Sequence, residues 1–120
     1  MQATLLFAHG SRDPAWRIPM ENVARCMVKL DPNALVRCAY LELTEPDLPT
    51  AVAELSALGV DNFTVVPMFL GVGKHAREDM PSLIRQLRTD YPEAVFHLKP
   101  SVGEEAEVIE LLARLSLPSR

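Results

Sequence analysis

The chain has 120 residues, of which 48% are hydrophobic, and its formal net charge at pH 7 is −4. This length suits one compact domain over residues 1–120, and the acidic balance excludes a general nucleic-acid-binding protein. No apolar run is long enough to cross a bilayer, and no signal peptide precedes the first polar loop, so we expect a cytoplasmic protein without a membrane partner.

Hydrophobic periodicity predicts four strands, each followed by a helix. In chain order, the strand and helix of each pair are predicted over residues 3–8 and 16–30, 34–41 and 44–58, 61–70 and 77–90, and 93–98 and 103–115. Short connections between such pairs indicate a parallel sheet with helices on both faces. The fold class is therefore α/β, and we expect a three-layer α/β/α domain with a four-stranded, mostly parallel sheet.

Three local signals refine these elements. Thr44 is predicted to be the N-cap of the second helix, because acidic residues follow it in the first turn. Pro67 cannot donate a ladder hydrogen bond, so the third strand is expected to end or bulge near it. The apolar side chains of the last helix are expected to face the core; they are Ala106, Ile109, Leu112 and Leu115.

Two histidines follow the ends of predicted strands. His9 comes directly after the first strand and His75 shortly after the third, and in a parallel sheet both loops lie at one edge. The second strand ends just before Glu42 and Glu45. Two imidazoles and a carboxylate from three neighbouring loops suit a divalent metal ion. The residues alone leave open which glutamate takes part, and whether the histidines are ordinary surface residues.

Arg12, Lys74 and Arg77 lie in or next to the two histidine loops. A basic patch on an acidic body would suit an anionic small molecule, although solvated surface charge explains these residues equally well. Gly71 and Gly73 belong to no Gly-x-Gly-x-x-Gly or Walker pattern, so we expect no bound nucleotide. A flavodoxin-like phosphate or nucleotide binder is a lesser alternative.

Three segments carry a family resemblance: FAHGSRDP at residues 7–14, AYLE at 39–42, and VVPMFL at 65–70, followed by GKH at 73–75 and DMP at 79–81. In this order they resemble the small class II chelatases of the CbiX type, relatives of the sirohydrochlorin chelatases. The resemblance implies a chelatase fold and the ATP-independent insertion of a divalent metal ion into sirohydrochlorin, in cobalamin or sirohaem biosynthesis.

The resemblance also implies roles for individual residues. His9 and His75 match the two metal-site histidines of the family, and Glu42 matches its acidic partner. These three are therefore the predicted catalytic residues and the predicted ligands of the metal substrate. Neutral imidazoles can hold a metal ion and accept the protons that a tetrapyrrole releases. Anchoring of the substrate carboxylates by the three basic residues named above is a local hypothesis, which the resemblance does not assign.

Imidazole ligands do not discriminate among cobalt, iron and nickel. Among these metals we expect Co²⁺ first, Fe²⁺ next and Ni²⁺ third. The alternatives are a sirohydrochlorin ferrochelatase or nickelochelatase, and a metal or tetrapyrrole carrier that catalyses nothing. One small lobe hardly encloses a flat macrocycle, and small members of the family act as homodimers, so we expect a homodimer here.

Overall fold

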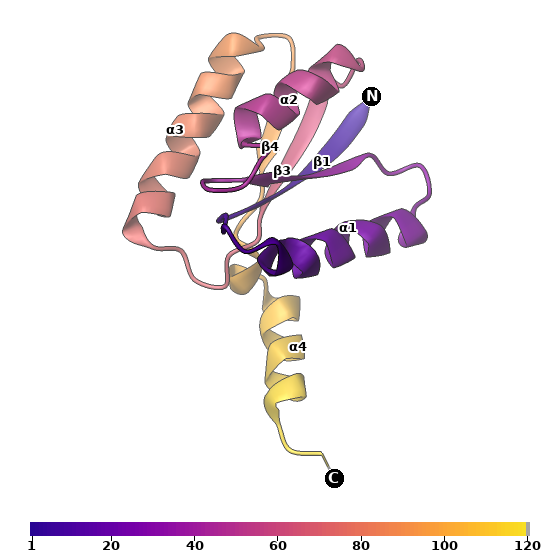
Figure 1. The fold of residues 1–120 in the computed structure, drawn as a ribbon, viewed down its shortest axis with the longest axis vertical. Coiled ribbons are helices and arrows are strands. Elements are labelled where there is room, and N and C mark those ends of the chain that lie inside the picture. Colours follow the sequence, from indigo (N-terminus) through magenta and orange to yellow (C-terminus); the bar gives the residue numbers. More distant parts are fainter. Residues whose placement is uncertain (120) are drawn as a thin grey trace.

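The computed structural model describes residues 1–119, so that of the predicted domain only Arg120 lies outside the described range. The strands are β1 (Gln2–Ala8), β2 (Val36–Tyr40), β3 (Asn62–Pro67) and β4 (Val95–Leu98). The helices are α1 (Ile18–Leu30), α2 (Leu48–Ala57), α3 (Lys74–Asp90) and α4 (Ala106–Ser116), with short 3-10 helices at Pro14–Arg17 and Val102–Glu104 (Figure 1). Each predicted strand and helix is found, and no helix within residues 1–119 is both long and apolar enough to span a membrane.

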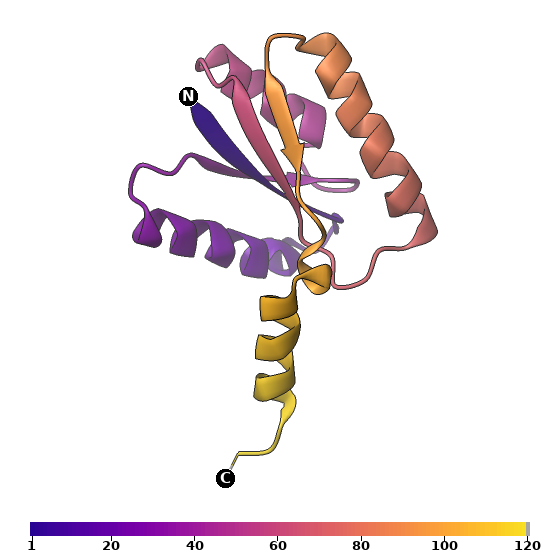
Figure 2. The same cartoon turned by 180° about the vertical axis from the view of Figure 1, so that it is seen from behind.

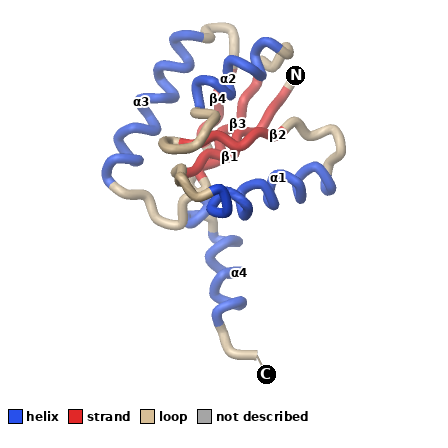
Figure 3. Tube along the Cα trace, in the orientation of Figure 1, coloured by secondary structure: helices blue, strands red, loops and turns tan. Residues whose placement is uncertain are grey.

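The strands form one sheet in the order β2-β1-β3-β4, and all three pairings are parallel (Figure 3). In the register of the central strand, Thr4 lies opposite Val36 of β2 and Thr64 of β3. Because the strands run in the same direction, the loops that follow them lie at one edge. The predicted parallel sheet is confirmed.

The two faces of the sheet bury different side chains, because successive residues of a strand point to opposite sides. In β1, Leu5 and Phe7 join the larger core cluster with residues of α2 and α3. Leu6 and Ala8 instead pack with Met20 of α1 in a smaller cluster. The sheet therefore has α2 and α3 on one face and α1 on the other, which confirms the three-layer α/β/α architecture (Figure 2).

Three of the predicted helix starts are wrong, and one of them is that of the last helix, which begins at Ala106 and not at residue 103. The second helix begins at Leu48, with the side chain of Asp47 as its N-cap, which accepts a hydrogen bond of 2.8 Å from the Thr50 amide. The hydrogen bonds from Thr50 lower the pKa of Asp47 below its ordinary value. The hydroxyl of Thr44 is used elsewhere, in a contact with the first loop. The third helix begins at Lys74, earlier than predicted, with Gly73 as its N-cap residue.

The prediction that the last helix faces the core is also wrong. α4 has no buried residue, and it points away from the three layers beyond the carboxyl edge of the sheet (Figures 1 and 2). The physical reason lies in the connection from β4. The amide of Gly103 donates a hydrogen bond of 3.0 Å to the carbonyl of Phe69, which directs the chain out past that edge.

Two leucines at the end of α2 provide a stability test of this core. Leu55 is fully buried, whereas Leu58 is 59% exposed. We expect Leu55→Ala to lower the free energy of unfolding by about 2–5 kcal/mol, because it leaves a cavity. Leu58→Ala is the matched control and should change it by less than about 0.5 kcal/mol. Urea unfolding followed by circular dichroism measures both, and equal effects would contradict the placement of α2.

Candidate functional site

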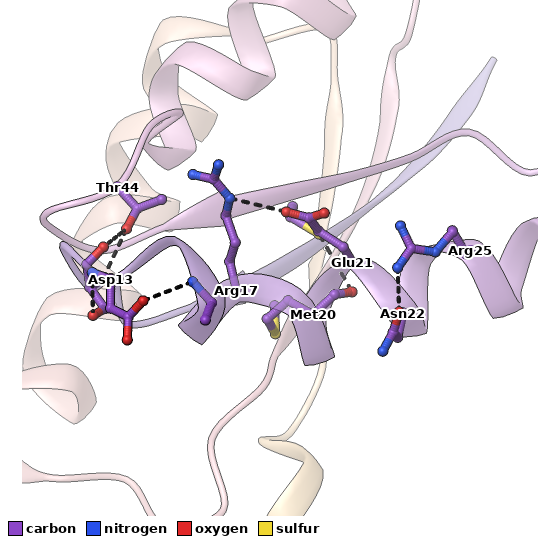
Figure 4. Close-up of polar contacts among 10 residues, drawn as sticks. Asp13, Arg17, Met20, Glu21, Asn22, Arg25 and Thr44 are labelled. Atoms are coloured by element: carbon purple, nitrogen blue, oxygen red, sulfur yellow. Dashed lines mark hydrogen bonds and ion pairs between the residues drawn. The ribbon is translucent and has the colours of Figure 1, made fainter.

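The loop after β1 and the loop after β2 are held side by side at the carboxyl edge. The amide of Leu41 donates to the carbonyl of Ala8 at 2.8 Å. Further out, the hydroxyl of Thr44 accepts from the Ser11 amide at 2.9 Å and donates to the Ser11 carbonyl at 2.8 Å. Figure 4 shows Thr44 bonded across to the first loop, beside Asp13. These bonds join the two loops at two positions, one at the strand ends and one further out.

The rest of the HGSRDP motif shapes the first loop and starts the following helix. The amide of Asp13 donates a hydrogen bond of 3.1 Å to the hydroxyl oxygen of Ser11. Its own carboxylate accepts from the Ala15 amide at 3.0 Å, which caps the 3-10 helix that begins at Pro14 (Figure 4). Ser11, Asp13 and Pro14 therefore have structural roles, and they make the loop before α1 rigid.

Gly10 allows the two loops to approach each other closely. A Cβ atom at this position would lie 1.4 Å from the carbonyl oxygen of Glu42 and 3.0 Å from the amide nitrogen of Thr44. No side chain fits there without moving the loops apart. The glycine of the motif is therefore required by contact between two backbones, and this contact places His9 next to Glu42.

The side chains of His9 and Glu42 meet at the edge. Nδ1 of His9 lies 3.3 Å from Oε1 of Glu42, and the Gly10 amide donates to the same oxygen at 3.5 Å. The imidazole also lies against Phe69, with 4.7 Å between ring centroids. A carboxylate only accepts hydrogen bonds, so a neutral His9 donates from Nδ1 and leaves its Nε2 lone pair free for a metal ion or a proton.

The geometry also separates the two glutamates that the sequence left as alternatives. Glu42 pairs with His9, and both side chains are about half exposed, at 44% and 50%. Glu45 is exposed and lines a neighbouring cavity of about 750 Å³, together with Glu42, Asp47 and Glu54. Of the two candidates, Glu42 is therefore the carboxylate that can act together with the histidine.

His75 is not brought into contact with this pair. It is exposed in the first turn of α3, one residue after the helix begins. Within residues 1–119, no three His, Cys, Asp or Glu side chains come close enough together to hold a metal ion. The structure thus assembles two of the three predicted ligands. The segment leading to His75 contains Gly71 and Gly73, around whose Cα atoms a Cβ would meet no other atom within 4 Å.

The three basic residues are divided between the two loops. Arg12 lies in the loop after β1, and Lys74 and Arg77 lie in the first turn of α3. All three are exposed, and none forms an ion pair within residues 1–119. They are therefore available to a ligand, in contrast to Arg17, which pairs with Glu21 at 3.1 Å on α1 (Figure 4).

Two residues near the edge are removed from acid–base chemistry by burial. Tyr40, the last residue of β2, has 3% of its surface exposed and packs near Trp16. Desolvation, with a further contribution from Cys38, raises the pKa of Tyr40 to about 12. Desolvation also raises the pKa of Cys38. Both groups are therefore protonated at neutral pH, and neither competes with His9 as a base.

The sequence patterns did not identify the apolar residues of the edge. Phe69 supports the His9 ring, Leu70 follows it with 71% of its surface exposed, and Leu43 follows Glu42 with 59% exposed. Leu43 has φ of 63°, in the left-handed region that non-glycine residues rarely adopt. For Phe69 and Leu70, the sequence signal was that two large apolar residues continue beyond Pro67, where the strand ends. These side chains give the site an apolar border beside its polar pair.

The comparisons with known proteins fit this arrangement. The sirohydrochlorin cobaltochelatase of Methanopyrus kandleri is 36% identical over 84 residues, which cover 70% of this chain and 59% of that protein. The chain therefore spans less than two thirds of the length of this relative.

Two solved structures are similar in fold. The CbiX protein of Marinobacter aquaeolei, described as a putative cobalamin biosynthesis protein, has a TM-score of 0.82 and 34% identity, with 96% of this chain and 93% of that chain covered. The sirohydrochlorin chelatase SirB of Bacillus subtilis subspecies spizizenii, in complex with cobalt, has a TM-score of 0.72 and 28% identity; the match covers 94% of this chain and 48% of that one. The CbiX family model matches residues 3–116, and the chain therefore belongs to the CbiX family.

Proposed function

We propose that this protein inserts a divalent metal ion, Co²⁺ in the first place, into sirohydrochlorin without ATP, as a step of cobalamin or sirohaem biosynthesis. The observation that carries the proposal is the His9–Glu42 pair at the carboxyl edge, 3.3 Å apart, in a member of the CbiX family. The cobaltochelatase name of the Methanopyrus relative and the cobalt complex of SirB support the choice of metal.

Insertion requires that the macrocycle lose two pyrrole protons while the metal ion leaves its other ligands. His9 would hold the metal ion, and His75 would join it once the start of α3 moves toward the pair, because the two histidines stand apart here. Glu42 would assist through Oε2, because Oε1 already accepts the bonds from His9 and the Gly10 amide. As the ion passes to the ring nitrogens, each freed imidazole can accept a pyrrole proton. The adjacent carboxylate stabilises the resulting positive charge on His9.

The border of the site suits the shape and charge of sirohydrochlorin, a flat macrocycle with many carboxylates. Leu43 and Leu70 offer exposed apolar surface to its faces. Arg12, Lys74 and Arg77 are exposed cations for its peripheral carboxylates, and each contact would be charge-assisted. Charge repulsion would keep the carboxylates of the substrate away from the cavity beside Glu42, because acidic side chains line that cavity.

The working form is proposed to be a homodimer. The structural match covers nearly all of this chain but only 48% of the cobalt-bound SirB chain. A second copy of this chain would therefore supply the mass that the longer protein holds in one chain. It would also give the open edge an opposite wall, which a flat substrate needs on its second face.

The proposal is tested by following the absorbance of sirohydrochlorin with Co²⁺, Fe²⁺ and Ni²⁺ in parallel. An enzyme accelerates the spectral change when the protein is far below one equivalent, with Co²⁺ the fastest. A carrier changes the spectrum only up to one equivalent of protein. That second outcome with all three metals would refute catalysis, and a faster reaction with Fe²⁺ or Ni²⁺ would replace cobalt as the physiological metal.

Loss of both histidines should abolish turnover. We expect His9→Ala combined with His75→Ala to lower the cobalt insertion rate by at least about 100-fold, because the ligands and proton acceptors are removed together. Binding of metal-free sirohydrochlorin, measured by a change in its fluorescence, should be retained. Turnover that survives the double substitution would show that the site lies elsewhere.

Glu42 and Glu45 form a matched pair for the role of the carboxylate. Glu42→Gln removes the charge beside His9 and should reduce turnover by about 10–100-fold, as is usual for the partner of a metal-site histidine. Glu45→Gln removes the same charge three residues away and should leave turnover unchanged. Steady-state rates of the two variants decide the point, and equal losses would mean that only the overall negative charge matters.

Gly10→Ala tests the contact between the two loops. The added Cβ would lie 1.4 Å from the Glu42 carbonyl, so the loops must separate and His9 must move away from Glu42. We expect a loss of about 1–3 kcal/mol in unfolding free energy, together with a loss of turnover. Gly71→Ala is the control, since its Cβ meets nothing within 4 Å. Full activity in Gly10→Ala would contradict the model of the site.

A further inference from the structure

The loop after β2 makes a tight and strained turn next to the candidate site. The amide of Thr44 donates a hydrogen bond of 2.8 Å to the carbonyl of Glu42, which closes a three-residue γ-turn centred on Leu43. The φ of 63° at Leu43 identifies the form of this turn that is rare and strained. Within residues 1–119, the other residue with positive φ is Gly59, which has no Cβ atom to clash.

The first loop imposes this backbone conformation. A Cβ at Gly10 would lie 1.4 Å from the Glu42 carbonyl oxygen and 3.0 Å from the Thr44 amide nitrogen, the two groups that close the turn. On the outer side, the Thr44 hydroxyl bonds twice to the backbone of Ser11 (Figure 4). The positive φ is therefore fixed by the packing of two loops, and a glycine at position 43 would adopt it at no steric cost.

The side chain of Leu43 contributes little to the packing of the lobe. It is 59% exposed, and within residues 1–119 it belongs to neither core cluster, whereas Leu41 packs against the larger one. Leucine at this position therefore combines a strained backbone with apolar surface left in water. A glycine would remove both costs. A large apolar side chain held under these conditions indicates a contact with a molecule outside the lobe.

We propose that Leu43 is a substrate-binding residue, whose side chain packs on the apolar ring face of the tetrapyrrole beside the metal ion held by His9. This inference rests on the proposed function and assigns a residue to its substrate. Glu42 precedes Leu43 directly, and its Oε1 lies 3.3 Å from Nδ1 of His9. One turn thus carries both the carboxylate of the pair and the leucine, so a macrocycle centred near His9 extends over Leu43.

The charges around Leu43 decide which part of the substrate it contacts. Leu43 lines the cavity beside Glu42 together with Glu45, Asp47 and Glu54. Like charges repel, so the substrate carboxylates are disfavoured at this position. The uncharged ring system meets no such repulsion, and its contact with leucine removes apolar surface from water on both partners. Leu43 is therefore suited to the ring face and not to the periphery.

The strained turn also prepares this contact before the substrate arrives. The backbone of Leu43 is held by the γ-turn hydrogen bond and by Gly10 and Ser11 of the first loop. A side chain on a fixed backbone loses less conformational entropy on binding than one on a mobile loop. The strain is thus borne in the free protein, and the same loop contact that pairs His9 with Glu42 also positions Leu43.

Three substitutions at position 43 separate the side chain from the backbone. Leu43→Gly removes the side chain and the strain, Leu43→Ala removes the apolar contact but keeps a Cβ at positive φ, and Leu43→Met keeps the apolar size. A fluorescence titration with metal-free sirohydrochlorin measures Kd. We expect Kd to rise about 10-fold for the glycine and alanine variants and to stay within about 2-fold for the methionine variant.

Leu58→Ala is the matched control for this titration. Leu58 is exposed to the same extent, 59%, but it lies at the C-terminal end of α2. Its removal should leave Kd for sirohydrochlorin unchanged. In turnover, the loss in Leu43→Ala should appear as a higher KM with kcat unchanged, because the ring contact exists both before and during metal insertion.

Thermal unfolding distinguishes a ligand contact from a structural role. Leu43→Gly should melt no lower than the unmodified protein and above Leu43→Ala, because glycine adopts positive φ freely. A structural leucine would instead make both variants melt lower, which would overturn the inference. Binding of Co²⁺ alone, measured by calorimetry, should be unchanged in both variants, since His9 and Glu42 are retained.

The outcomes separate this inference from the proposed enzyme. An unchanged Kd in both Leu43→Gly and Leu43→Ala refutes the ring contact alone. A 10-fold rise in Kd in a protein that binds sirohydrochlorin but inserts no metal supports the contact and refutes the proposed catalysis. No binding of sirohydrochlorin by the unmodified protein refutes both. A lower mass of the variants by light scattering would assign Leu43 to contact with a second copy and would also overturn the inference.

Discussion

The backbone contact between Gly10 and Glu42 is the constraint on which the candidate site depends. A glycine at the end of β1 lets the next loop approach until its carbonyl occupies the space of a side chain. The reciprocal bonds of Thr44 with Ser11 hold this approach in place. His9 and Glu42 are 33 residues apart in the chain, and their side chains still meet at hydrogen-bond distance. Their pairing is therefore a property of two loops packed as one unit, supported on the far side by Phe69.

That unit in turn needs the central position of β1 in the sheet. Because β1 pairs with both β2 and β3, its carboxyl end lies next to both of the other site loops. Leu5 and Phe7 are buried on one face of the sheet, and Leu6 and Ala8 are buried on the other, so β1 is packed between two helical layers. His9 is the first residue after this buried strand and is half exposed, so its side chain is held in place and is still open to solvent.

The sequence predicted the succession of strands and helices along the chain well, but it predicted contacts between distant residues poorly. Periodicity located every strand and every α-helix, and the strand-end rule placed His9 and Glu42 at one edge. Thr44 was misassigned as an N-cap because its true partner, Ser11, lies 33 residues away. His75 shows the limit of the same rule, which specifies an edge and not a distance. For α4, the apolar face was evident, but amphipathic periodicity does not say which surface covers that face.

The two departures from expectation, at His75 and α4, concern the same side of the molecule. The third predicted ligand stands apart from the His9–Glu42 pair, and the last helix extends past the edge that bears the candidate site, so this edge is open. The match to the cobalt-bound SirB covers only 48% of that longer chain. In the proposed homodimer, Leu43 and Leu70 at the edge would face a second copy and a flat substrate. Their exposure in one lobe is what the proposed site with two walls would require.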